Sequence, residues 1–125
     1  MAARIVIVHD DNTFRDPLVT SLIQNGHEVV AFEQPTPAWD ALATDNAVDV
    51  LITRVRFPVG NPHGVALAQW AHTNHRQIQV LFVAAPEMQA YIDGLGVLVP
   101  TPTSPTVVVD TVTQLLVSGS GDSER

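Results

Sequence analysis

The sequence contains no cysteine and no lysine, and each absence restricts the chemistry that the chain can perform. Without cysteine, disulfides, thiol catalysis and thiolate metal sites are excluded. Every basic residue is an arginine, so any mechanism that requires a lysine amine is excluded as well. No apolar run approaches the roughly 20 residues that span a membrane, and no signal-peptide pattern follows Met1. We therefore expect a cytoplasmic protein.

Positive charge is also scarce. Six arginines stand against 13 acidic residues, and the formal net charge of −7 disfavours binding to nucleic acid or to a membrane surface. Charged residues make up 15% of the chain and hydrophobic residues 46%, a composition that favours a folded core over disorder. We expect one domain over residues 1–117 and a flexible, small and polar tail over residues 118–125.

Short aliphatic runs alternate with helical patterns along the chain. The predicted strands are residues 5–8, 28–32, 48–53, 78–83 and 97–99, and the predicted helices begin near residues 12, 37, 65, 86 and 105. This alternation predicts an α/β fold with a five-stranded parallel sheet of order 2-1-3-4-5 and helices on both faces, the flavodoxin-like arrangement. In such folds the functional site lies beyond the carboxyl ends of the strands.

The ends of the first helix carry specific signals. Asn12 or Thr13 can cap its start, which would place Pro17 in the first turn if Thr13 is the cap. Gly26 is a natural stop at the other end, because glycine readily adopts the left-handed conformation that ends many helices.

Five segments, taken in their order and spacing, carry a resemblance to a known family. They are Ile5-Val-Ile-Val-His-Asp-Asp11, Asp49-Val-Leu-Ile-Thr-Arg-Val-Arg-Phe-Pro58, His63-Gly64, Val80-Leu-Phe-Val-Ala-Ala85 and Thr101-Pro102. Over almost the whole chain, from Arg4 to Val117, the sequence resembles the receiver domains of bacterial two-component response regulators, the family that includes the chemotaxis regulators.

The resemblance implies a site for phosphoryl transfer. In that family an acidic pair after the first strand holds Mg²⁺, and an aspartate at the end of the third strand accepts the phosphoryl group. A Ser or Thr after the fourth strand and a Lys after the fifth strand bind that group. In this chain the acidic pair falls on His9 and Asp10, with Asp11 next, the phosphoacceptor position on Arg54, the hydroxyl position on Ala84 and the lysine position on Thr101.

These substitutions predict that the phosphorylation chemistry is lost. Mg²⁺ prefers oxygen ligands, so the imidazole of His9 weakens its site. The guanidinium of Arg54 is not a nucleophile, and its positive charge repels a metal cation. We expect Arg54 to pair with Asp10 or Asp11 instead. The chain then reads as a pseudo-receiver: not an enzyme, without cofactor, with Mg²⁺ binding lost or very weak. It would act in a phosphorelay context by contacting another signalling protein or a second copy of itself.

Two alternatives stay open at this point. A one-residue slip of the third strand would bring the hydroxyl of Thr53 to the phosphoacceptor position, or Asp10 or Asp11 could accept the group, giving an atypical phosphorylated receiver. The other alternative is a domain that binds a small ligand or a metal in the degenerate pocket. The interval from Ala84 to Thr101 is shorter than is usual in the family, so we expect a shortened fourth helix. Members of the family often bind partners on the face that includes this helix, and we do not carry that role over to this chain.

Aromatic and apolar residues outside the pocket allow two interpretations. Phe57 and Val59 lie in a proline-containing loop beside the site, where they could form a docking surface or simply belong to a rigid loop. Trp39 and Trp70 fall in helical patterns, where half-buried packing is the expected role rather than stacking on a ligand.

Histidines raise the question of a metal site. His9 with Asp10, and His72 with His75 at a helix end, have suitable side chains, but no third ligand at suitable spacing is evident for either pair. We therefore expect surface histidines at these positions and no metal site.

Overall fold

The computed structural model describes residues 2–45, 47–57, 63–75 and 77–123, and over these ranges strands and helices alternate. The strands are β1 (Arg4–Val8), β2 (Glu28–Phe32), β3 (Val50–Thr53), β4 (Gln79–Ala84) and β5 (Val97–Pro100). The helices are α1 (Asn12–Gln24), α2 (Pro35–Thr44), α3 (Gly64–Asn74), a 3₁₀ turn η1 (Pro86–Met88), α4 (Gln89–Ile92) and α5 (Pro105–Ser123). None of the helices in these ranges is long and apolar enough to cross a membrane.

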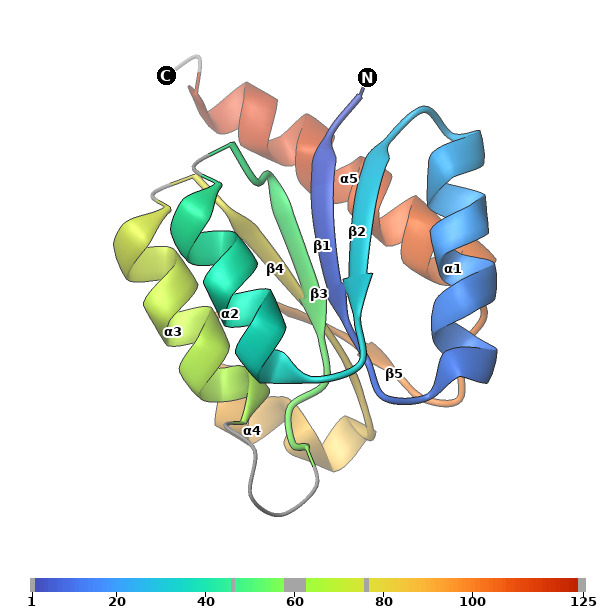
Figure 1. Ribbon diagram of the computed structural model, residues 1–125, viewed down its shortest axis with the longest axis vertical. Helices are drawn as coiled ribbons and strands as arrows, with labels where there is room; N and C mark the ends of the chain where they lie inside the picture. Colours follow the sequence, from blue (N-terminus) through green and yellow to red (C-terminus); the bar gives the residue numbers. More distant parts are fainter. Residues whose placement is uncertain (1, 46, 58–62, 76, 124–125) are drawn as a thin grey trace.

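The five strands form one parallel sheet in the order β2-β1-β3-β4-β5, as the alternating pattern predicts. Helices α2 and α3 lie over one face of the sheet and α1 and α5 over the other (Figure 1). Because every strand runs in the same direction, the carboxyl ends of β1, β3, β4 and β5 meet at one edge. The predicted fold class is confirmed, and this edge is where the candidate site residues gather.

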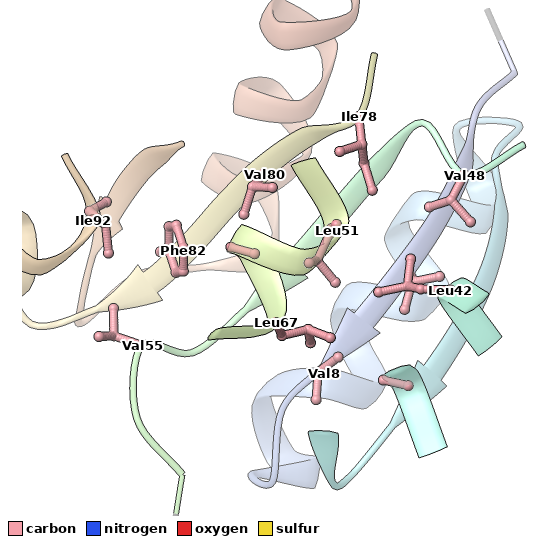
Figure 2. Close-up of a cluster of buried hydrophobic side chains, with 14 of the residues drawn as sticks. Val8, Leu42, Val48, Leu51, Val55, Leu67, Ile78, Val80, Phe82 and Ile92 are labelled. Atoms are coloured by element: carbon pink, nitrogen blue, oxygen red, sulfur yellow. The ribbon is translucent and has the colours of Figure 1, made fainter. Parts of the chain in front are cut away.

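Side chains alternate between the two faces along each central strand, which divides the core into two clusters. Val8, Leu51 and Phe82 point toward α2 and α3, where they pack with Leu42, Leu67 and others (Figure 2). The neighbouring residues of the same strands point toward α1 and α5, and these include Ile7, Ile52 and Leu81. Strands buried on both faces are therefore apolar throughout, as the sequence pattern indicates.

Helix α1 begins differently from the sequence expectation. Its N-cap is Asp11, neither Asn12 nor Thr13, because the Asp11 carboxylate accepts a hydrogen bond from the backbone N–H of Thr13. Pro17 consequently lies inside the helix, beyond its first turn. The predicted stop is confirmed, since Gly26 adopts a φ of 91° immediately after the helix.

The last two helices compare differently with the sequence expectation. The fourth is short, as expected, since it consists of η1 and the four residues of α4. Helix α5 continues to Ser123, so the helix does not end at Val117 where we expected the domain to stop. Once a helix is established, each further residue adds a hydrogen bond at little nucleation cost, and no proline interrupts this segment. Flexibility of residues 118–125 in solution stays a prediction.

The start of α3 lies unusually close to the end of β3, and a glycine makes this approach feasible. A Cβ atom on Gly64 would lie 1.7 Å from the carbonyl oxygen of Arg54 and 2.9 Å from the hydroxyl oxygen of Thr53. The backbone N–H of Gly64 also donates to the carbonyl of Val55 at 2.9 Å. The β3–α3 connection is thereby fastened at the edge that carries the site.

Candidate functional site at the carboxyl edge of the sheet

An ion pair joins the ends of β1 and β3. The Arg54 Nη1 atom donates to the Asp10 Oδ1 atom at 2.5 Å, and the two side chains are 39% and 34% exposed. Burial alone opposes ionisation of Asp10, but the hydrogen bond and the positive charge of Arg54 outweigh it and hold the pKa of Asp10 below its ordinary value. The expected pairing of Arg54 with one of the two aspartates is confirmed, and the partner is Asp10.

Asp11 caps the start of α1 and also lines the pocket. Its Oδ1 atom accepts from the hydroxyl of Thr13 at 2.6 Å and from the backbone N–H of Thr13 at 3.0 Å. The hydroxyl hydrogen bond, followed by the backbone one, lowers the pKa of Asp11. One oxygen of this carboxylate is therefore committed to the helix end.

His9 is buried, with 8% of its surface exposed, which corrects the expectation of a surface histidine. Its Nδ1 atom accepts from the backbone N–H of Asp11 at 3.1 Å, and its ring packs on Phe14 with centroids 4.9 Å apart. Burial, and then the positive charge of Arg54, lowers the pKa of His9. A neutral ring that accepts at Nδ1 carries its proton on Nε2, so His9 is a hydrogen-bond donor on that side.

Arg15 belongs to the site although sequence reasoning did not select it. This residue of α1 has a buried side chain, and its Nη1 atom donates to the carbonyl of His9 at 2.8 Å. Its other nitrogens lie 3.3 Å from Asp16 and 3.6 Å from Glu33. The signal that could have found it is its position one turn into a helix that starts beside the first strand, where a long cationic side chain can reach back to that strand's end.

Thr53 does not face the pocket. It is fully buried, it pairs with Val8 across β1 and β3, and its hydroxyl donates to the carbonyl of Arg54 at 3.0 Å. Arg54 is the next residue and its side chain lines the pocket instead. The one-residue slip is therefore contradicted, and Thr53 is not placed to accept a phosphoryl group.

The pocket itself, which we call the site hollow, has a volume of about 330 Å³. Its lining residues are His9, Asp11, Arg54, Val55, Arg56, Val83, Ala84, Ala85, Met88 and Thr101. Ala84 and Thr101 are brought together by a hydrogen bond from the Thr101 N–H to the Ala84 carbonyl at 2.9 Å. Since small-molecule sites occupy roughly 300–1,000 Å³, the alternative of a small ligand in this hollow stays a prediction.

The residues of the hollow do not fit Mg²⁺. A magnesium ion needs carboxylate or carbonyl oxygens with free lone pairs, and it retains several waters. Asp10 binds a guanidinium through one oxygen, Asp11 binds Thr13 through one oxygen, and Arg54 adds a fixed positive charge beside Asp10 that repels a cation. The arrangement therefore holds itself together by charge pairing, and we derive no metal-dependent step from it.

The two loop residues beside the site have different outcomes. Phe57 is buried, with 6% of its surface exposed, and packs in the core cluster under α2 and α3, which contradicts the docking-surface interpretation for this residue. An aromatic side chain next to an apolar core gains more from burial than from exposure. Val59 lies outside the described residues.

His72, His75 and the two tryptophans have structural contacts. His75 is buried and its Nε2 atom lies 2.7 Å from the Leu42 carbonyl, while the His72 Nε2 atom lies 2.5 Å from the Leu95 carbonyl. The expectation that His75 is a surface histidine is therefore wrong. No group of three or more metal-binding side chains occurs among the residues that the structure describes. Trp39 and Trp70 are half-buried against the core cluster, as predicted.

Comparison with known proteins finds response-regulator sequences that are similar to this chain. No family model matches the chain. It is 26% identical to a chemotaxis protein CheY homologue of Campylobacter jejuni over 125 residues, 95% of this chain and 96% of that protein. It is 32% identical to the response regulator protein FleR of Pseudomonas aeruginosa over 85 residues, which cover 68% of this chain but 17% of FleR.

Solved structures agree on the fold. The chemotaxis response regulator CheY4 of Vibrio cholerae superposes with a TM-score of 0.80 at 19% identity, over 92% of this chain and 99% of that chain. A CheY-like receiver domain protein from Methanospirillum hungatei superposes with a TM-score of 0.85 at 18% identity, over 98% and 99%. The chain therefore has the receiver fold of response regulators.

Proposed function

We propose that this receiver-fold domain is a pseudo-receiver, which takes part in two-component-type signalling through protein contacts and without accepting a phosphoryl group. The similarity to a CheY homologue and to a response regulator supports the signalling context. The Arg54–Asp10 ion pair is the observation that carries the proposal. It occupies the place where the resemblance puts a phosphoacceptor and a magnesium carboxylate.

The chemistry that remains in the hollow supports this reading. An aspartyl phosphate needs a free carboxylate nucleophile, a cation to offset the charge of the incoming group, and groups that hold the product. Arg54 offers no carboxylate nucleophile at the phosphoacceptor position. Ala84 has no hydroxyl, and the chain has no lysine that could stand at the position of Thr101. On this proposal the domain has no enzymatic activity and no cofactor of its own.

A single resting conformation follows from the same arrangement. A ligand shifts a conformational equilibrium only as far as it binds the two states differently. With Arg54 already paired to Asp10 and only a methyl group at Ala84, a phosphoryl mimic finds no differential contact. The domain would then present one constant surface to its partner, another signalling protein or a second copy of itself.

Beryllofluoride, which mimics an acyl phosphate, tests the proposal. Two-dimensional amide spectra of the ¹⁵N-labelled protein should superimpose with and without beryllofluoride and millimolar Mg²⁺. Saturable shifts of the amides around Ala84 and Thr101 would show that the hollow responds to a phosphoryl mimic and would overturn the proposal. A receiver with an intact site, measured in parallel, establishes that the reagent is active.

A further inference from the structure

A second hollow lies beside the site hollow, on the side of α3 and α4, and we call it the Arg56 hollow. It has a volume of about 250 Å³ and is lined by Val55, Arg56, His63, Val65 and Tyr91. The two hollows share Val55 and Arg56, so the β3–α3 connection separates them. From this geometry we propose that the Arg56 hollow is a docking site for a partner protein. The partner segment would insert an apolar side chain into the hollow and place a neighbouring carboxylate against Arg56.

The apolar part of the proposal rests on the floor and walls of the hollow. Val55 is 2% exposed and belongs to the core cluster, so the floor is fixed by the fold. Val65 packs on the same cluster from the first turn of α3, and Tyr91 is 54% exposed on α4. A volume of about 250 Å³ falls below the usual range of cofactor and drug-sized sites, roughly 300–1,000 Å³, so it suits a side chain of a larger partner.

The charged part rests on Arg56. Its guanidinium carbon lies 5.0 Å from the centroid of the Tyr91 ring, which holds the cation over the rim of the hollow. Among the described residues, Arg4, Arg15 and Arg54 each pair with a carboxylate, whereas Arg56 pairs with none. An arginine fork without a partner is matched in geometry to a carboxylate.

Two neighbouring features favour an anionic partner further. Helix α3 begins at the wall of the hollow with His63 as its N-cap, and it has no acidic residue in its first turn to offset the positive end of the helix. The acidic residues nearest in sequence to Tyr91 are Glu87 and Asp93, and the Asp93 carboxylate is bound to the Gln89 amide at 3.1 Å. Neither carboxylate forms an ion pair with Arg56 in the part of the chain that the structure describes.

Because the molecule has a net negative charge, the positive rim of the Arg56 hollow favours this site over the rest of the surface for an acidic segment. With a formal charge of −7, most of the surface repels an acidic segment, and the Arg56 hollow is a place where such a segment gains attraction. Tyrosine and arginine are also the residue types that contribute most at protein interfaces. This inference deepens the proposed function and rests on it, because it names the chemistry of the partner of a constant, unphosphorylated surface.

Short peptides test the inference without knowledge of the natural partner. Acetyl-Asp-Leu-Leu-Asp-amide and its neutral counterpart acetyl-Asn-Leu-Leu-Asn-amide would each be titrated into ¹⁵N-labelled protein. We expect saturable shifts confined to the amides of Val55, Arg56, Val65 and Tyr91, with the acidic peptide binding at least about threefold more tightly, the range of one partly exposed charge contact. The difference should shrink as salt is raised, because the contact is exposed to solvent.

Matched variants locate the effect. Arg56→Gln should abolish the preference for the acidic peptide, whereas Arg4→Gln, which removes the same charge at the opposite edge of the sheet, should keep it. Tyr91→Ala should weaken both peptides, since it removes a wall of the hollow. Equal binding of the two peptides, shifts elsewhere on the protein, no binding at all, or equal effects of Arg56→Gln and Arg4→Gln would each overturn the inference. None of these outcomes depends on the response to beryllofluoride, so the proposed function can fail or survive separately.

Discussion

The guanidinium of Arg54 and the carboxylate of Asp10 meet at 2.5 Å, so a salt bridge ties the end of β3 to the end of β1. The two side chains remain about a third exposed, which places the pair between a surface contact and a buried one. Removing one member of a fully buried pair typically costs about 3–5 kcal/mol, whereas exposed pairs are worth about 0–1 kcal/mol. This intermediate burial sets the size of the first prediction.

We predict a coupling free energy of about 1 kcal/mol between Arg54 and Asp10. Denaturant unfolding of wild type, Arg54→Ala, Asp10→Ala and the double variant gives this number as a thermodynamic cycle. Arg54→Asp should be less stable than Arg54→Ala, because it places a carboxylate beside Asp10 and Asp11. If the single substitutions are additive, the pair contributes nothing and Arg54 is a solvent-facing bystander.

Stability should fall as the pH falls through about 6.5, the pKa of a histidine in the unfolded chain. Burial lowers the pKa of both His9 and His27 in the folded protein, and in each the Nδ1 atom accepts a backbone hydrogen bond. The unfolded state therefore binds protons that the folded state does not, so the stabilisation is present above this pH and lost below it.

Urea unfolding from about pH 7.5 to about pH 5.5 measures this dependence. The substitution His9→Gln should reduce the slope, because it removes one of the two buried imidazoles whose pKa is lowered. Comparing slopes between variants cancels the general charge effects that all of them share. An unchanged slope in His9→Gln would show that His9 titrates alike in both states.

Millimolar Mg²⁺ should leave the unfolding midpoint of the wild-type protein unchanged, because a ligand that does not bind the native state cannot stabilise it. Arg54→Asp removes the opposing charge and supplies an oxygen ligand, so its midpoint should rise with Mg²⁺. A clear rise in the wild type would contradict our account of the hollow. NaCl, added at matched ionic strength, controls for general ionic effects.

Gly64→Ala should cost more than about 1–3 kcal/mol, the usual penalty of an overpacked site. The added methyl group would lie 1.7 Å from the Arg54 carbonyl, so the β3–α3 connection would have to shift. Ala66→Gly, in the same first turn, serves as the control and should cost about 0.5–1 kcal/mol through backbone entropy alone. Equal losses in the two variants would mean that the close approach at Gly64 is readily relieved.

Much of the fold follows from the sequence because strands buried on both faces are apolar along their whole length. The runs around Val6, Ile52 and Phe82 predict three central strands, and the helical patterns between them predict parallel connections. That Arg54 pairs with Asp10 or Asp11 was also accessible, since all three residues follow strands predicted to lie side by side, but only the structure identifies Asp10 as the partner.

The features that sequence reasoning missed depend on which local hydrogen bond wins. Asp11, Asn12 and Thr13 are all good caps, and only the geometry of the β1–α1 turn selects Asp11. His75 is a polar residue at a helix end and would be expected at the surface. It is buried because the backbone carbonyl of Leu42 is available to its ring. Neither choice is visible in hydrophobic periodicity.

The central claim, that Arg54 has replaced phosphoryl chemistry, is tested most directly by intact mass after incubation with acetyl phosphate and Mg²⁺. The account predicts an unchanged mass for the wild type. Arg54→Asp, which restores the acceptor but not the hydroxyl at Ala84 or the lysine at Thr101, should be modified poorly compared with an intact receiver. A wild-type protein that gains the mass of one phosphoryl group, lost again in Asp10→Asn or Asp11→Asn, would contradict the account.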